Sequence, residues 1–331
     1  MNATPRSIAV VGLGAWGSAL ALHCARLGHK VVGWHREQSF VREVGASGSL
    51  PCANQLFPLP SSLTLSANLA DADGADLTIV ALPAAAWGEV LPKLPQPKIL
   101  ISATKGLERD TVQTPLAFAK QSLQLADERL CVISGPSFAS DLAAARPLSI
   151  VAASRSEQTA VLVAEALSGD SLRVYASRDP LGVELGGILK NVIAIACGAS
   201  DSIGFGPSAR AALISRGLAE MSRLAAALGA DIQTLTGLSG LGDLVMTATE
   251  DQSRNRQVGL RLGRGEKIAD IIKALGSTAE GVTTAPLVQT LAATSSVVVP
   301  ITDMVVELLK GEVPPLELAK RLMTRPIKSE F

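Results

Sequence analysis

The N-terminal segment is the strongest constraint on what this chain can fold into. The apolar run 8–11 leads directly into Gly12, and Gly14 and Gly17 follow before a stretch rich in alanine and leucine that ends at Gly28. The apolar run favours a buried strand, and the later stretch favours a helix. The chain therefore starts with a strand, a glycine turn and a helix, as a doubly wound α/β domain does.

Each of the three glycines has a physical role in such a turn. Gly12 permits the tight turn, Gly14 lets the backbone approach a pyrophosphate, and Gly17 lets the helix pack on the strand. The first N–H groups of the helix and the positive end of its dipole then favour an anionic phosphate. This segment predicts a dinucleotide-binding site, and a glycine-rich turn in another kind of α/β protein is the alternative.

Composition argues against several classes of protein. The 331 residues carry 30 basic and 30 acidic side chains, so neither nucleic acid nor a membrane surface is an expected partner. No run reaches about 18 apolar residues, and Lys190-Asn191 interrupts the best candidate, 188–199, so no membrane insertion is expected. The four cysteines lack C-x-x-C spacing, which predicts no metal site and no disulfide and fits a cytoplasmic protein.

The distribution of histidine narrows the possible chemistry. His23, His29 and His35 are the three histidines, and all lie in the first 35 residues. A proton transfer farther along the chain must therefore use Lys, Asp, Glu or the single Tyr175. His23 and His29 flank the first predicted helix, where we expect a structural role.

Short apolar runs alternate with helical patterns as far as Tyr175. The expected strands are 7–12, 30–34, 77–81, 99–103, 130–134, 148–153 and 171–175. The expected helices are 16–27, 37–45, 84–91, 111–125, 138–145 and 156–168. This alternation predicts a Rossmann-type, doubly wound parallel sheet over residues 1–178. Residues 46–62 are rich in proline and serine and are expected to form an irregular loop.

Helical patterns alone follow, so residues 179–331 are expected to form an all-α second domain. Asp179 is suited to cap a helix, and Pro180 to occupy its first position. The expected helices are 180–201, 208–228, 241–248, 254–263, 266–275, 282–294, 301–310 and 315–323.

Ligands of a parallel sheet gather at the carboxyl ends of its strands. Three predicted strands end in polar loops: Thr104-Lys105-Gly106, Gly135-Pro136-Ser137 and Trp34-His35-Arg36. Lys105 can reach a substrate phosphate or carbonyl from there, although a solvated loop lysine is the commoner case. Arg36 lies where an acidic residue usually selects NAD, which slightly favours NADP, while Glu37 keeps NAD open.

Lys190 is the sharpest candidate for acid–base chemistry. It lies in a predicted helix among small and apolar residues, and Gly186-Gly187 precede it by one turn. Desolvation there is expected to lower the pKa of its ammonium group, and the glycines indicate that something approaches the helix closely. A lysine that extends to solvent along a surface stripe explains the local pattern equally well. Asn191 can bind a substrate hydroxyl or bond to backbone or water.

Two further segments of the helical region can bind ligands. Ser253-Arg254-Asn255-Arg256 precede an apolar-periodic helix and combine a cap, N–H groups and guanidinium groups into a candidate anion site. Asp243 follows three glycines in residues 237–242 and can orient Lys190 or accept a bond from a substrate hydroxyl. An ordinary helix cap with surface arginines is the plain alternative for the first segment, and a helix cap for Asp243.

These motifs, in this order, resemble the bacterial-type NAD(P)-dependent glycerol-3-phosphate dehydrogenases. The matching stretches span nearly the whole chain: GLGAWGSALA (12–21), ATKGLE (103–108), SGPSFA (134–139), LKNVIAIA (189–196), ISRGLAEMSRL (214–224), GLSGLGDL (237–244), SRNR (253–256) and Glu280-Gly281. The resemblance implies hydride transfer to dihydroxyacetone phosphate, giving sn-glycerol 3-phosphate for phospholipid synthesis, and a homodimer.

The resemblance also implies roles for individual residues. Lys190 would be the proton donor and acceptor. The substrate residues would be Lys105, Gly135, Ser137, Lys190, Asn191, Asp243, Ser253, Arg254 and Asn255. The cofactor residues would be Gly12, Gly14, Ala15, Trp16, Gly17, His35, Arg36, Lys105, Ala139, Arg254 and Glu280.

Some positions depart from the family pattern, and other functions compete. The departures, at Ala84, Ser202, Ser208 and Ala279, put cofactor preference in doubt rather than the reaction. A β-hydroxyacid dehydrogenase or a ketopantoate reductase would share the architecture, but the SRNR and GLSGLGD stretches argue against both. A dinucleotide-sensing module without catalysis would need neither a lysine in an apolar helix nor an anion site.

Overall fold

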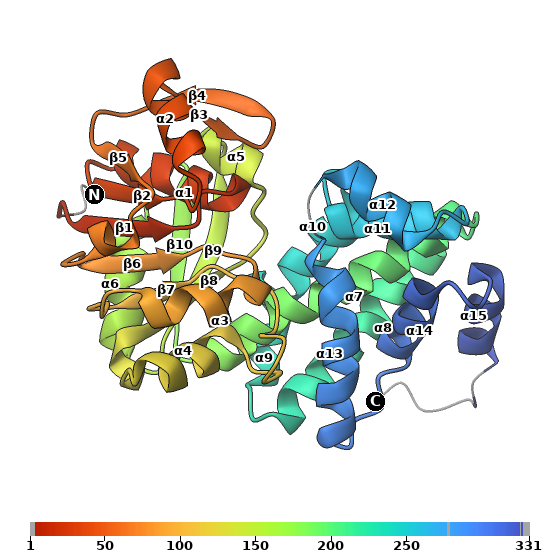
Figure 1. Ribbon diagram of the computed structural model, residues 1–331. Coiled ribbons are helices and arrows are strands. Elements are labelled where there is room, and N and C mark those ends of the chain that lie inside the picture. The colour runs from red at the N-terminus through yellow and green to blue at the C-terminus, as the bar shows by residue number, and fades with distance from the viewer. Residues whose placement is uncertain (1–3, 277–278, 325, 327–331) are drawn as a thin grey trace. The chain divides into compact units, whose positions relative to one another are not determined.

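The computed structural model describes residues 4–276, 279–324 and 326 (Figure 1). Contacts between residues divide the chain into two compact units, of which the first ends at Glu184 and the second begins at Leu185. The first unit is built on a sheet, and the second is helical in the part that the structure describes.

An eight-stranded sheet forms the centre of the first unit. Its strand order is β10-β9-β8-β7-β6-β1-β2-β5. The bounds are Ser7–Val11 (β1), Lys30–Trp34 (β2), Leu63–Ser66 (β5), Leu77–Val80 (β6), Leu100–Ser102 (β7), Leu130–Ser134 (β8), Leu148–Ala153 (β9) and Leu172–Ser177 (β10). From β1 the chain adds β2 and β5 on one side, and it then returns to add β6 to β10 on the other side of β1. This change in the order of the strands is the doubly wound arrangement, so the predicted Rossmann-type fold is confirmed.

One pair of strands departs from the expected parallel pattern. β8 and β9 pair antiparallel, with Ile133 opposite Ala152. The helix in their connection, α5 (Ala139–Ala143), is about 8 Å long. It is too short to return the chain along the roughly 17 Å of β8, which a parallel neighbour would require.

Helices cover both faces of the sheet. Their bounds are Ala15–Arg26 (α1), Gln38–Ser47 (α2), Trp87–Val90 (α3), Pro115–Leu123 (α4), Ala139–Ala143 (α5) and Glu157–Leu167 (α6). Along β1, Ile8 and Val10 belong to one buried cluster, and Ala9 and Val11 belong to another. The strand is therefore buried on both faces, as its continuous apolar run requires.

The expected irregular loop at residues 46–62 is wrong. β3 (Ser49–Cys52) and β4 (Gln55–Pro58) form an antiparallel hairpin there, and β5 follows directly. Ala53 and Asn54 make its two-residue turn, both with positive φ, which suits a hairpin turn. The prolines suggested a loop, but an isolated two-stranded hairpin has free edges at which proline is tolerated.

The second unit contains the remaining helices. Their bounds are Gly206–Ala227 (α8), Ile232–Thr236 (α9), Asp243–Thr249 (α10), Arg254–Gly263 (α11), Ile268–Leu275 (α12), Glu280–Thr294 (α13), Pro300–Lys310 (α14) and Pro315–Met323 (α15). A π-helical turn, η5 (Leu238–Gly242), precedes α10. The sequence pattern missed α9, which has five residues and only one buried side chain, Leu235.

Helix α7 (Pro180–Ser202) spans the division between the units, and most of its residues belong to the second. Asp179 caps it as predicted, since its carboxylate accepts a 2.9 Å bond from the Gly182 N–H. Among the described residues it is the one helix with the length and mean hydropathy of a membrane span, although Lys190-Asn191 interrupt its apolar run. Its most apolar 18-residue stretch is 94% buried inside the protein, as in a core helix.

A buried acid in the first unit predicts a pH-dependent stability. Burial raises the pKa of Glu184 to about 7, although hydrogen bonds from the Leu116 N–H and the Thr114 hydroxyl act in the opposite direction. The folded state therefore binds this proton more tightly than the unfolded chain, and stability is lost as pH rises from about 4.5 to 7. Glu184→Gln removes the charge that the folded state must bury at high pH.

We expect Glu184→Gln to gain about 2 kcal/mol over the wild type as the pH is raised from 5.5 to 8. Urea unfolding at both pH values measures the gain. A difference between the two proteins that does not change with pH would contradict the assignment.

Candidate active site

The glycine turn between β1 and α1 has the form that the sequence predicts. Gly12 has φ +103°, and a Cβ on it would lie 2.8 Å from the Ala81 carbonyl oxygen. A Cβ on Gly17 would collide with the carbonyl oxygen of Gly12. Gly14 faces open space, and no side chain caps the helix that begins at Ala15. The turn thus has packed glycines on its inner side and an open backbone at the helix N-terminus, which suits a diphosphate.

The loop after β2 exposes a cation. The Arg36 side chain is 80% exposed and lies 3.7 Å from the carboxylate of Glu37. The imidazole of His35 stacks on the ring of Phe40, with 4.1 Å between the centroids. His35 is therefore held in place, while the Arg36 guanidinium can reach an anion in solution.

The ends of β7 and β8 bring three predicted site residues together. The Lys105 ammonium donates to the carbonyl oxygen of Gly135 at 3.1 Å, and the Ser137 hydroxyl donates to the same oxygen at 3.0 Å. Gly135 has φ +150°, and a Cβ there would lie 2.9 Å from the Ile150 Cα. A glycine is thus required where the two side chains converge.

Lys190 lies inside the second unit, on α7, with 5% of its surface exposed. Its ammonium donates to the Asp243 carboxylate at 2.6 Å and to the Thr247 hydroxyl at 2.6 Å. Asp243 is fully buried, and the Thr247 hydroxyl lies 3.3 Å from the same carboxylate oxygen. The surface-lysine alternative is excluded, because the amine is buried and paired with an acid.

Sequence reasoning missed Thr247. Asp243 and Thr247 are four residues apart and so share one face of α10. That spacing was the available signal, but a threonine in a helix is too common to single out without its partner.

Gly186 lets the π-helical turn η5, which precedes Asp243, pack closely on α7. A Cβ on Gly186 would lie 2.5 Å from the carbonyl oxygen of Ser239. The close approach expected at Gly186-Gly187 is therefore made at Gly186 by the backbone of η5. Because η5 leads directly into α10, this contact sets the position of Asp243 relative to Lys190.

An amide pair joins α7 to α11. Asn255 donates from its side-chain nitrogen to the side-chain oxygen Oδ1 of Asn191 at 2.8 Å, and its own side-chain oxygen accepts from the Gly281 N–H at 2.9 Å. A Cβ on Gly281 would lie 2.8 Å from the Asn191 backbone oxygen. Asn255 thus fixes the first turn of α11 against both α7 and α13.

The SRNR segment forms the start of α11. The hydroxyl of Ser253 accepts from the Arg256 N–H at 3.2 Å, so Ser253 is the predicted N-cap. Arg254 is exposed, whereas Arg256 is buried. Arg254 is thus the exposed cation at this helix terminus.

Glu280 lies near Arg254. Burial raises the pKa of Glu280 to about 7, although the positive charge of Arg254 lowers it.

Comparisons with known proteins agree along the whole chain. Residues 7–160 match the N-terminal region, and residues 179–320 the C-terminal region, of NAD-dependent glycerol-3-phosphate dehydrogenase. This chain belongs to that family.

Individual relatives support the assignment. Glycerol-3-phosphate dehydrogenase (NAD(P)+) of Halorhodospira halophila is 43% identical over 328 residues, which cover 98% of each chain. The protein of the same name from Leptothrix cholodnii is 44% identical and covers 98% of this chain and 99% of its own. The crystal structure of glycerol-3-phosphate dehydrogenase from Coxiella burnetii matches with a TM-score of 0.91 at 37% identity, covering 97% of this chain and 99% of its own. The resemblance predicted from the motifs is confirmed.

The Gly186 contact leads to a testable prediction. Gly186→Ala places a methyl group against the backbone of η5, which must move and take Asp243 with it. We expect a loss of about 1–3 kcal/mol in stability. Dehydrogenase turnover should fall more than about tenfold, because a displacement near 1 Å can cost about a hundredfold in rate.

The matched control for this variant is Gly45→Ala in α2, where nothing lies within 4 Å of the added carbon. It should retain turnover and gain slightly in stability. Wild-type turnover and melting temperature in Gly186→Ala would show that the contact does not position Asp243.

Proposed function

We propose that this chain catalyses the reversible, NAD(P)H-dependent reduction of dihydroxyacetone phosphate to sn-glycerol 3-phosphate, which supplies glycerophospholipid synthesis. The supporting observation is the buried Lys190, bonded to Asp243 and Thr247, in a chain of the glycerol-3-phosphate dehydrogenase family. An amine held in this way can exchange a proton with the oxygen of a ketone.

The glycine turn is the proposed cofactor site, and its open backbone at Gly14 fits a dinucleotide. The nicotinamide of a bound NADH or NADPH supplies the hydride. We assign cofactor contacts to Gly12, Gly14, Ala15, Trp16, Gly17, His35, Arg36, Lys105, Ala139, Arg254 and Glu280. The exposed guanidinium of Arg36 can meet a ribose 2′-phosphate, which slightly favours NADP, and NAD stays open.

Lys190 is the proposed proton donor. As hydride reaches the C2 carbon of the ketone, negative charge develops on the oxygen, and the ammonium of Lys190 stabilises it and transfers a proton. The Asp243 carboxylate accepts a 2.6 Å hydrogen bond from this ammonium and so orients the proton donor. In the oxidation direction the neutral amine accepts the hydroxyl proton.

The phosphate end of the substrate needs a separate anion site. We assign it to the start of α11, where Ser253, Arg254 and Asn255 combine a guanidinium with the positive end of a helix. The other proposed substrate residues are Lys105, Gly135, Ser137, Asn191 and Asp243. Holding the phosphate fixes the ketone carbon relative to the Lys190 amine, which removes much of the entropic barrier.

We also propose a cytoplasmic homodimer. The homodimer comes from the family resemblance. Free thiols at Cys24, Cys52, Cys131 and Cys197 support the compartment, because a reducing environment preserves them.

Replacing Lys190 tests the proton transfer. Lys190→Met keeps the length of the side chain and removes its proton, so we expect kcat for dihydroxyacetone phosphate reduction to fall about 10²–10⁴-fold. The affinity for NADPH, measured by fluorescence titration, should stay within about twofold. Lys98→Met, at an exposed lysine paired with Asp76, is the control and should be fully active. Near-normal turnover in Lys190→Met would exclude the proposed role.

Replacing Arg254 tests the anion site. We expect Arg254→Ala to raise the KM for dihydroxyacetone phosphate about 30–100-fold, which corresponds to a charged hydrogen bond of about 2–3 kcal/mol. The weak reduction of dihydroxyacetone, which has no phosphate, should change little. Arg261→Ala, in the last turn of the same helix, is the control. An equal effect on both substrates would show that Arg254 does not recognise the phosphate.

A further inference from the structure

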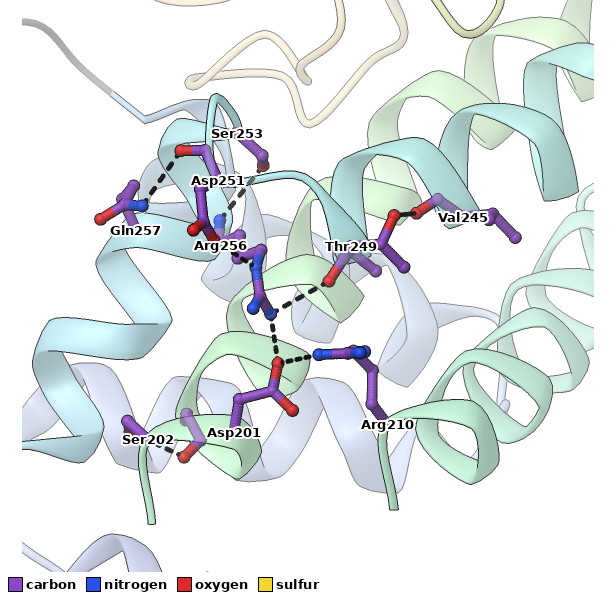
Figure 2. A network of polar contacts seen from close by, with 11 residues as sticks. Asp201, Ser202, Arg210, Val245, Thr249, Asp251, Ser253, Arg256 and Gln257 are labelled. Atoms are coloured by element: carbon purple, nitrogen blue, oxygen red, sulfur yellow. Dashed lines mark hydrogen bonds and ion pairs between the residues drawn. The ribbon is translucent and has the colours of Figure 1, made fainter. Parts of the chain in front are cut away.

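An ion network joins α11 to α7 (Figure 2). Arg256 donates to the carboxylate of Asp201 on α7 and to the carboxylate of Asp251 at 3.1 Å. It also donates to the Ala248 carbonyl oxygen at the end of α10, at 3.2 Å. The side chains of Arg256 and Asp201 are only 8% and 11% exposed, so this pair is shielded from water and salt.

The two helices are in backbone contact beside this network. A Cβ on Gly198 of α7 would collide with the Arg256 carbonyl oxygen, and a Cβ on Gly259 of α11 would collide with the Ile195 carbonyl oxygen. A Cβ on Gly263 would collide with the Ser202 hydroxyl. Glycines permit this close approach but present no side chain that could interlock.

Arg256 adds a second specific contact between these helices, besides the bond between Asn255 and Asn191. Its neighbours Arg254 and Asn255 carry the proposed phosphate site, and its partner Asp201 lies eleven residues beyond Lys190 on one continuous helix. That separation is about 16 Å along the α7 axis. The bond between Arg256 and Asp201 therefore connects the anion site rigidly to the helix that carries the amine.

Asp201 accepts hydrogen bonds from two arginines. One of its oxygens, Oδ2, accepts from Arg256 and also from Arg210 of α8 at 2.6 Å, while Oδ1 is buried without a protein partner. Arg210 is the more exposed of the two arginines, at 28% against 8%. A charge-assisted bond weakens as water reaches it, so the bond from Arg256 is the dominant one.

We propose that Arg256 and Asp201 form a positioning pair that sets the distance between the phosphate site on α11 and the Lys190 amine on α7. The pair thereby selects substrates by the spacing between their phosphate and their ketone. This inference rests on the proposed function. It assigns no contact with substrate to either residue, since their side chains are only 8% and 11% exposed and are bonded to each other.

The test compares two substrates that differ only in that spacing. They are dihydroxyacetone phosphate and its homologue with one more methylene between the ketone and the phosphate. The ratio of their kcat/KM values is measured for the wild type, Arg256→Lys, Arg256→Met and Asp201→Asn. A residue needed only for folding would lower both rates together and leave this ratio unchanged.

We expect Arg256→Met and Asp201→Asn to reduce the preference for dihydroxyacetone phosphate at least about tenfold, mainly through a higher KM for that substrate. Arg256→Lys keeps the charge and should restore part of the preference. The double variant should be no worse than either single variant, because both remove the same bond. Affinity for NADPH should not change.

Two arginines provide matched controls. Arg210→Met removes the other partner of Asp201, and Arg261→Met removes the ion pair with Glu266 from the opposite end of α11. Both should keep the substrate ratio within about twofold. A loss in Arg261→Met equal to that in Arg256→Met would overturn the proposal, because any disturbance of α11 would then produce it.

The remaining outcomes are also decisive. If Arg256→Met does not fold, Arg256→Lys and Asp201→Asn decide, and a wild-type ratio in both overturns the proposal. A wild type that does not reduce dihydroxyacetone phosphate at all contradicts the proposed function itself. A fully active wild type with unchanged ratios in the variants contradicts only the positioning role.

Discussion

A buried ammonium group is the constraint on which the helical unit depends. Removing an unpaired charge of this kind from water costs several kcal/mol, so Lys190 is tolerable inside α7 only with a counter-ion. Asp243 provides it at 2.6 Å, and Thr247 adds a third polar atom. The backbone contact at Gly186 brings the loop before Asp243 close enough for this arrangement. The pairing of Lys190 with Asp243 is therefore required both for stability and for the proposed chemistry.

Much of this could be predicted from the sequence because local patterns encode it. The strand–glycine–helix start gave the Rossmann-type sheet, and Asp179-Pro180 gave the start of α7. The pairing of Lys190 with Asp243 was predicted only as one of three roles for Asp243, since 53 residues separate the two. Thr247, the antiparallel β8–β9 pair and the β3–β4 hairpin were missed. Each of these depends on contacts between distant segments or on proline in an unusual place, which periodicity does not report.

Glycine serves different purposes in the two units. In the turn after β1, Gly12 and Gly17 remove side chains so that the turn and helix can pack, and the backbone near Gly14 is left open for a ligand. In the helical unit, Gly186 and Gly259 remove side chains so that two backbones meet. Buried polar bonds, such as that of Asn255 with Asn191, accompany contacts of the second kind. This use of glycine also explains why the glycine-rich segments were informative in the sequence.

Chemical rescue of Lys190→Ala measures the central claim most directly, because truncation of the side chain leaves space for a small amine beside Asp243. The account predicts that the variant is nearly inactive and that methylammonium restores dihydroxyacetone phosphate reduction in a saturable way. The tetramethylammonium ion, which has no proton to give, should restore nothing. Two results would contradict a proton transfer from the buried amine. One is equal restoration of activity by both ions, and the other is a Lys190→Ala variant that turns over as fast as the wild type without any added amine.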